Sequence, residues 1–297
     1  MRALHGKRLR GTLYLLVWLA QTAWGQGVPR EQAFPIESLP VHLQAQAEAV
    51  FLRLMDREGL YTVIGGMKPM SSAFVTLAFD PSDEKQVAQL DTLRQILRTF
   101  RCGEELYADM MVFQKAQNGK KVAHGIVVNR ESLRATIRQY ASFFASLGIT
   151  EHSHPMEVVM AVEYAPRAQR HRGYGYLFGY PKYAVDFFVQ AGDEEEATGR
   201  FVQRDFVHIP TFERETNLFV WAVPKGHQEN EEDQRIRRLA SRILASYKAR
   251  RARYIGKDKP GIAQLLRDWL DDSTGQCSLL HARFAASIPL FPEPPRK

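Results

Sequence analysis

The chain has 297 residues, of which 45% are hydrophobic, and a formal net charge of +7 at pH 7. This length and apolar content are enough for a properly buried core. Four cations and no acidic residue lie in the first 25 residues, so the remainder carries a net charge of +3, which is too mild to argue for a nucleic acid or another polyanion as partner.

The first 25 residues have the pattern of a secretory signal peptide. Basic residues precede the apolar run 13–20, and small residues stand at Ala23 and Gly25, the third and first positions before the expected cleavage point. The apolar run is shorter than the roughly 20 residues that span a bilayer, and no later run is longer. We therefore expect a mature protein without a transmembrane segment, secreted or periplasmic.

Polar, proline-broken residues 26–40 predict an arm that leads into the domain, and helical spacing of apolar residues follows over 43–55. Residues 60–64 read as a strand, 65–72 as an irregular turn and 73–79 as a second strand. Asp80 is a good N-cap for a helix that ends before Gly103.

Asn118-Gly119 between residues 106–115 and 121–129 is the strongest hairpin signal in the chain and predicts an antiparallel pair. Further along we expect an amphipathic helix over 133–147 and, over 156–164, either a buried helix or a strand, of which the helix is favoured. A short buried helix from 182, an acidic loop at 192–196 and strands over 201–209 and 218–223 follow. Acidic residues at 229–233 and arginines near 250–253 indicate a long helix, and a short one follows over 262–270.

Strand pairs mixed with helices, without regular alternation, predict an α+β fold in which helices pack on a mainly antiparallel sheet. No Pro/Gly/Ser-rich linker divides the chain, so we expect a single domain over 41–290, followed by a disordered tail at 291–297.

Residues 173–181, Gly-Tyr-Gly-Tyr-Leu-Phe-Gly-Tyr-Pro, alternate between aromatic and small residues. In an extended segment Tyr174, Tyr176, Phe178 and Tyr180 would share one face, opposite nearly bare backbone that another group can approach. One interpretation is a core strand. The other is a stacking platform for a ligand, in which Arg172 supplies charge beside Tyr174 and Tyr176.

The turn at 65–72 offers a second candidate ligand site. Gly65 and Gly66 can direct their N–H groups to one side as an anion nest, and Lys68, Ser71 and Ser72 would complete a site for phosphate or carboxylate. The spacing is not that of a P-loop, and a plain tight turn between strands explains the same residues.

His152 and His154 form the third candidate, because in an extended segment both imidazoles would face the same side, as two ligands of one metal must. No HExxH pattern or third ligand at a diagnostic spacing accompanies them, so two loop histidines beside Pro155 are the alternative.

Cys102 and Cys277 are the chain's two cysteines. An oxidising compartment favours a disulfide between them, whereas two unpaired buried thiols are the alternative, since the sequence does not show the distance between them.

Nucleophile motifs and the dinucleotide fingerprint are both missing, so we expect no cofactor. The basic run 235–259 suits either an anionic surface or a solvated outer face, and the acidic start of the same helix favours the second. Two hypotheses remain. The first is a binding or accessory protein for an envelope component or small anionic ligand. The alternative is an extracytoplasmic hydrolase, with or without a metal held by His152 and His154.

Overall fold

The computed structural model describes residues 28–116 and 118–279. The expected signal peptide and the tail at 291–297 lie outside these residues. No helix in the described ranges is long and apolar enough to cross a membrane.

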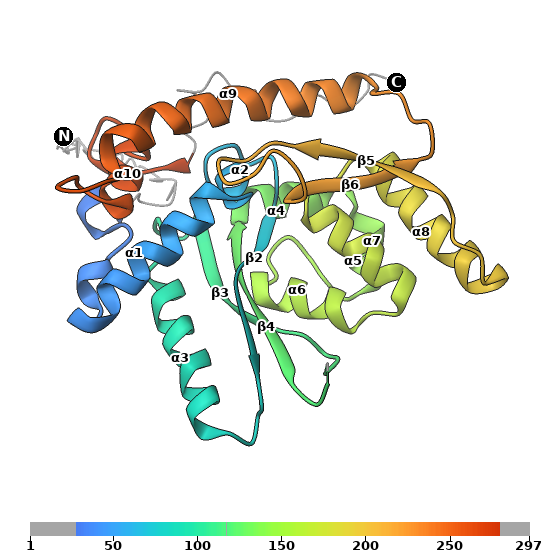
Figure 1. The fold of residues 1–297 in the computed structure, drawn as a ribbon, viewed down its shortest axis with the longest axis horizontal. Helices are drawn as coiled ribbons and strands as arrows, with labels where there is room; N and C mark the ends of the chain where they lie inside the picture. The colour runs from blue at the N-terminus through green and yellow to red at the C-terminus, as the bar shows by residue number, and fades with distance from the viewer. Residues whose placement is uncertain (1–27, 117, 280–297) are drawn as a thin grey trace, which may run out of the picture.

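The fold is α+β, as expected, with helices around small antiparallel sheets (Figure 1). The strands are β1 (Val28–Pro29), β2 (Met70–Phe79), β3 (Leu106–Val112), β4 (Lys121–Asn129), β5 (Arg204–Ile209), β6 (Phe219–Pro224) and β7 (Gln276–Cys277). The α-helices are α1 (Val41–Asp56), α2 (Gly59–Val63), α3 (Glu84–Arg98), α4 (Arg130–Gln139), α5 (Ala141–Ser146), α6 (Pro155–Tyr164), α7 (Arg167–Leu177), α8 (Lys182–Thr198), α9 (Glu231–Tyr254) and α10 (Ile262–Trp269). Short 3-10 turns cover Arg30–Gln32 and Ile36–Ser38.

The central sheet has the antiparallel order β2-β4-β3 and is buried on both faces. Side chains alternate along β4, so Val127 joins the large core formed with α1, α3, α9 and α10, whereas Ile126 and Val128 join the second core under α4, α6 and α7. The predicted hairpin is present, with Asn118 and Gly119 at φ +51° and +75° between β3 and β4.

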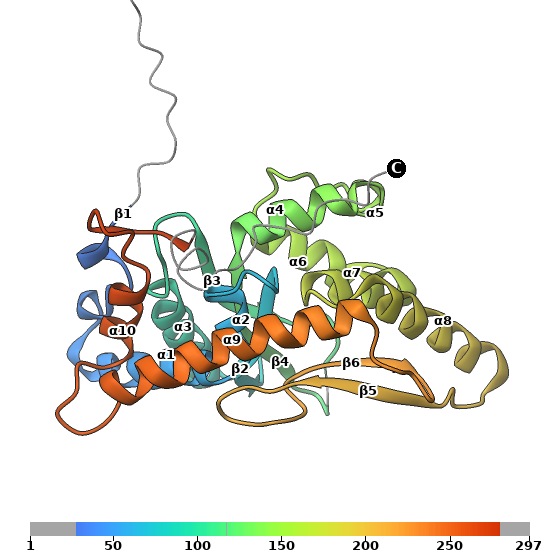
Figure 2. The ribbon, with the colours of Figure 1, turned by 90° about the horizontal axis from the view of Figure 1, so that it is seen from above.

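The second sheet is the β5-β6 hairpin, which lies at the periphery beneath the long helix α9 (Figure 1). It is separate from the central sheet, and Figure 2 shows it at the outer margin of the molecule. Within the described residues β5 has no strand neighbour besides β6, so one of its edges is unpaired.

Several predicted elements differ in the structure. Residues 60–64 are not a strand but belong to the short helix α2, since a short apolar run buried all round has no periodicity that separates helix from strand. The N-cap of α3 is Asp83, whose carboxylate accepts from the N–H groups of Lys85 and Gln86; Asp80 instead accepts from Ser82.

The acidic segment 192–196 is not a loop, because α8 continues through it and ends at Gly199 in the left-handed conformation. The helix predicted over 133–147 is interrupted at Tyr140 and forms α4 and α5.

The described part of the N-terminal arm packs into the large core. Phe34 is fully buried, and its ring meets those of Phe51 and Phe100 at centroid distances of 6.5 and 5.2 Å.

Candidate functional site

The segment 173–181 is the largest departure from expectation, because its first half is helical. Residues 167–177 form α7 and do not present an extended aromatic face. The glycines serve close packing between helices: a Cβ on Gly173 would lie 2.7 Å from the Val162 side chain of α6, and one on Gly175 would lie 2.6 Å from Val185 of α8. The close approach inferred from the bare backbone is present, but it joins helices.

The two tyrosines proposed as a platform have internal partners. Tyr176 is buried and stacks on Tyr140 at a centroid distance of 3.7 Å, while the Tyr174 hydroxyl donates to Glu163 Oε2 at 2.7 Å. Burial and the bond to Glu163 raise the pKa of Tyr174. Arg172 is paired with Asp186. These contacts give a ligand platform at Arg172, Tyr174 and Tyr176 no support.

Lys68 brings the first two candidate segments together. Its side chain is fully buried, and Nζ donates to Glu58 Oε2 at 2.7 Å. The ammonium lies 5.3 Å from the ring centroid of Phe178, 5.6 Å from that of Tyr180 and 4.2 Å from that of Phe219. We call Lys68, Glu58 and these three rings the lysine box. Burial lowers the pKa of Lys68, and Glu58 acts in the opposite direction.

The remaining residues of the predicted anion nest also have structural partners. A Cβ on Gly65 would lie 2.6 Å from Ile243 of α9, and the Gly66 carbonyl accepts from Ser132 at 2.9 Å. Ser71 is buried and bonds Thr62 at 2.7 Å. Ser72 is partly exposed at an irregularity in the β2-β4 register. Because the Lys68 ammonium is already paired with Glu58, it is not available to bind an anion at this turn.

His152 and His154 occupy different environments. The His152 side chain is 86% exposed, whereas His154 caps α6 by accepting from Met156 N–H at 3.2 Å and packs edge-on against Tyr107. Within residues 28–116 and 118–279 no three His, Cys, Asp or Glu side chains cluster as metal ligands would. No contact in the described ranges joins these histidines to Lys68.

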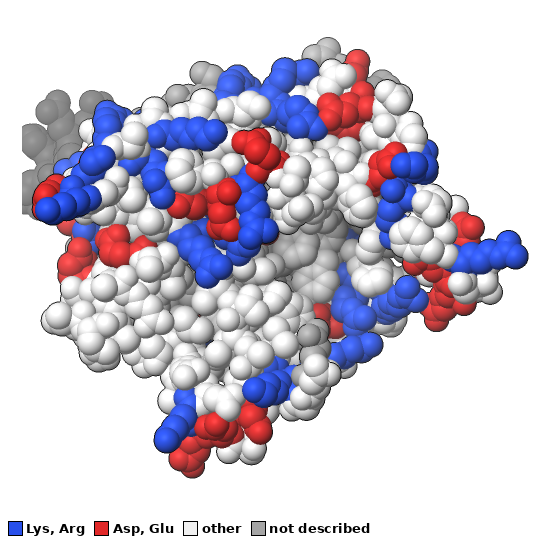
Figure 3. Space-filling model, in the orientation of Figure 1, with Lys and Arg blue, Asp and Glu red and all other residues white. Residues whose placement is uncertain are grey.

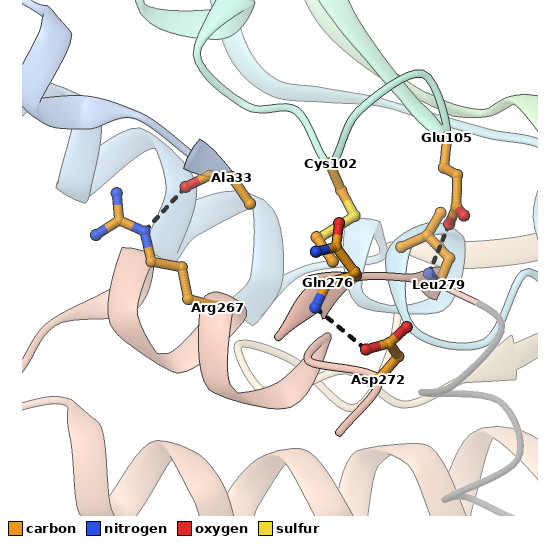
Figure 4. Close-up of a disulfide and its surroundings, with 8 residues drawn as sticks. Ala33, Cys102, Glu105, Arg267, Asp272, Gln276 and Leu279 are labelled. Atoms are coloured by element: carbon orange, nitrogen blue, oxygen red, sulfur yellow. Dashed lines mark hydrogen bonds between the residues drawn. A yellow bond between two sulfur atoms is a disulfide. The ribbon is translucent and has the colours of Figure 1, made fainter. Parts of the chain in front are cut away.

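Cys102 and Cys277 form a disulfide, with their Cα atoms 5.7 Å apart. Figure 4 shows it between the loop that precedes β3 and strand β7. Close by, Arg267 donates to the Ala33 carbonyl at 2.9 Å and Leu279 N–H donates to Glu105 at 2.6 Å. The bridge joins two segments that lie 175 residues apart in the sequence, and strand β1 of the N-terminal arm pairs with β7 beside it.

The structure contains a pocket that the sequence did not indicate, between β5 and the start of α9. It is an open cavity of about 380 Å³. Its lining comes from both strands of the hairpin, the loop between them and α9 with its preceding turn: Asp205, Phe206, Val207, His208, Pro210, Glu215, Thr216, Val223, His227, Glu229 and Arg237.

The pocket follows the unpaired edge of β5. Residues 205–208 are consecutive, and their side chains alternate between the two faces of the hairpin, so a cavity that touches all four lies along the strand's edge. Arg237 Nη1 donates to the His208 carbonyl at 3.0 Å from α9, so that carbonyl points away from β6. Every second residue of an antiparallel strand is oriented in this way, so Phe206 also presents its N–H and C=O at the free edge.

The pocket's charged lining is mainly acidic. Asp205 is paired with Lys225 at 2.6 Å, which lowers the pKa of the carboxyl, and Glu229 is paired with Arg237. Glu215 is exposed and has no ion-pair partner in the described part of the chain. Phe206, with 55% of its surface exposed, adds an aromatic side chain. The arrangement suits a ligand that carries positive charge and apolar groups.

A buried carboxylate orients the imidazole of His227, one of the residues that line the pocket. Asp233 is fully buried and accepts from His227 Nε2 at 2.8 Å, from Asn230 N–H at 3.2 Å and from the Tyr183 hydroxyl. The Tyr183 ring stacks on His227, and burial together with the bond to Asp233 raises the pKa of Tyr183. Asp233 orients the ring with Nε2 as donor.

Sequence reasoning missed this pocket because its residues have no diagnostic spacing. The available signal was the alternation of Arg204, Phe206 and His208, polar or aromatic on one face, along a strand that precedes a long loop.

Comparisons with family models, curated proteins and solved structures find no match to this chain.

Proposed function

We propose that this chain is an exported binding protein that takes an extended peptide segment with basic side chains by adding it as a strand to β5. The observation that carries the proposal is the open pocket along the unpaired edge of β5. Extended peptides bind exposed sheet edges through main-chain hydrogen bonds, and alternate side chains give specificity.

The N–H and C=O of Phe206 and the N–H of His208 supply the main-chain half of such a site, whereas the His208 carbonyl already accepts from Arg237. The side-chain half comes from the exposed ring of Phe206 and from Glu215, whose carboxylate has no cation in the described ranges. A ligand strand would place alternate side chains toward these two groups. The ligand expected here is cationic, which differs from the small anionic ligand expected from the turn at 65–72.

Two labelled synthetic peptides test the proposal: one alternates lysine and valine, the other alternates glutamate and valine. Fluorescence anisotropy with the exported chain should show binding of the lysine peptide and much weaker binding of the glutamate peptide. Glu215→Gln should weaken binding of the lysine peptide a few-fold, since an exposed charge pair contributes up to about 1 kcal/mol.

Two substitutions at one position test strand addition itself. Phe206→Ala removes the ring but keeps the edge N–H, whereas Phe206→Pro also removes the N–H, and proline is tolerated on an edge strand when no ladder bond is lost. Phe206→Pro should weaken binding about two- to ten-fold more than Phe206→Ala, because one further hydrogen bond of about 1 kcal/mol is lost. Equal binding by the two variants, with both folded by circular dichroism, would contradict strand addition.

A further inference from the structure

The outer face of α9 carries a row of arginines. Arg235, Arg238, Arg242 and Arg253 are all exposed. At about 100° and 1.5 Å per residue they lie within an arc of about 60° over about 27 Å of helix. We call these four residues the arginine stripe. Figure 3 shows Lys and Arg side chains gathered along the upper edge of the molecule, where α9 runs in Figure 1.

The stripe differs from the inward arginines of the same helix. Arg237 is paired with Glu229, and Arg251 is paired with Asp56 at 2.7 Å. In the described ranges Arg238, Arg242 and Arg253 have no ion-pair partner, while Arg235 lies near Glu232. The fold thus neutralises the inward charges and leaves a row of arginines on the outside, which begins one helical turn after the exposed carboxylates of Glu231 and Glu232.

The helix surface between the arginines carries only short side chains. Ala245, Ala249 and Ala252 are exposed on this side of the helix, so no side chain there projects beyond the guanidinium groups. No large exposed hydrophobic residue of the described chain belongs to α9. A partner would therefore meet charge along a straight line, without an apolar wedge to insert.

We propose that the arginine stripe docks the protein on an anionic phospholipid bilayer. Guanidinium groups form bidentate hydrogen bonds with phosphate oxygens. A straight row of arginines at the edge of the molecule can contact a planar bilayer surface along its whole length. The stripe lies on the opposite side of α9 from Arg237 and the pocket, so this inference is independent of the peptide site.

Co-sedimentation of the exported chain with vesicles tests the proposal. Phosphatidylcholine vesicles containing phosphatidylglycerol should bind the chain, and pure phosphatidylcholine vesicles should not. Each cation near such a surface changes partitioning about five-fold, so Arg238→Gln/Arg242→Gln should lower it about 25-fold. Salt near 1 M, where the screening length is about 3 Å, should abolish binding.

The matched control is Arg138→Gln/Arg167→Gln, which removes the same charge from two exposed arginines that already have partners, Glu151 and Glu196. This variant should keep nearly the full partitioning. An equal loss of partitioning in both double variants would show that net charge, and not the arginine stripe, determines binding. Absence of binding to anionic vesicles at low salt would overturn membrane docking. Tighter binding to duplex DNA than to vesicles at equal phosphate concentration would also overturn it.

Discussion

The lysine box and the β5-α9 pocket contain the same kinds of residue, but the charged groups are paired internally in the first and partly available to a ligand in the second. Both place cations, carboxylates and aromatic rings together. In the box Lys68 is fully buried and its ammonium has Glu58 and three rings as partners, whereas in the pocket Phe206 is 55% exposed and Glu215 has no cation beside it in the described ranges. Whether a charged group already has an internal partner decides whether it stabilises the fold or remains available to a ligand.

The box also shows the cost of enclosing a charge. Burial lowers the pKa of Lys68 and raises that of Tyr180. A buried pair of this kind stabilises the fold only while both partners are present.

The largest effect is expected for Lys68→Met. This substitution removes the cation and leaves Glu58, which is 14% exposed, without its partner. Breaking a buried pair in this way costs about 3–5 kcal/mol of unfolding free energy. Urea denaturation measures the change.

Two further variants sharpen the contrast with the pocket. Glu58→Gln/Lys68→Met should recover most of the loss, because no buried charge remains. Lys225→Gln breaks the exposed pair with Asp205 of the pocket and should cost less than about 1 kcal/mol. A Lys68→Met loss as small as that of Lys225→Gln would remove the distinction between the two regions.

An intermediate effect is expected at the contact between α7 and α8, beside the segment that carries Phe178 and Tyr180 of the lysine box. Gly175→Ala places a methyl group 2.6 Å from Val185, and such overpacking costs about 1–3 kcal/mol. Gly192→Ala is the matched control, since the nearest atom, on Arg167, is 3.6 Å away and alanine favours helix by about 1 kcal/mol. The midpoint temperature of thermal unfolding should therefore fall for Gly175→Ala and rise for Gly192→Ala. Shifts of the same sign would disprove the close-packing role of Gly175.

The smallest effect concerns the pH dependence that a half-buried histidine of the central sheet gives to stability. Burial lowers the pKa of His124, which lies on β4 with its ring 4.7 Å from that of Phe113. The unfolded chain then takes up a proton first, near the usual histidine pKa of about 6.5, so stability falls as pH drops from about 7 to about 5. His124→Gln should flatten this decline in the urea midpoint, and an unchanged slope would contradict the assignment.

Elements specified by local chemistry could be predicted from the sequence. Asn118-Gly119 places both residues in the left-handed region and thereby sets the β3-β4 hairpin. The acidic start and basic end of α9, and the Pro155 start of α6, likewise depend on neighbours in the chain.

The glycine-tyrosine segment shows where such reasoning fails. Alternation of period two suits a strand, but the same glycines let α6 and α8 approach α7 closely, and that packing energy is invisible in a local window.

The sequence by itself determined the α+β class, the hairpin and the long charged helix, because those depend on periodicity and on adjacent residues. Only the tertiary structure decided that Lys68 is enclosed by Glu58 and aromatic rings, and that the edge of β5 meets Arg237 and Glu229 in an open pocket. These outcomes depend on which distant side chains become neighbours, and it is those neighbours that satisfy a charge or leave it exposed.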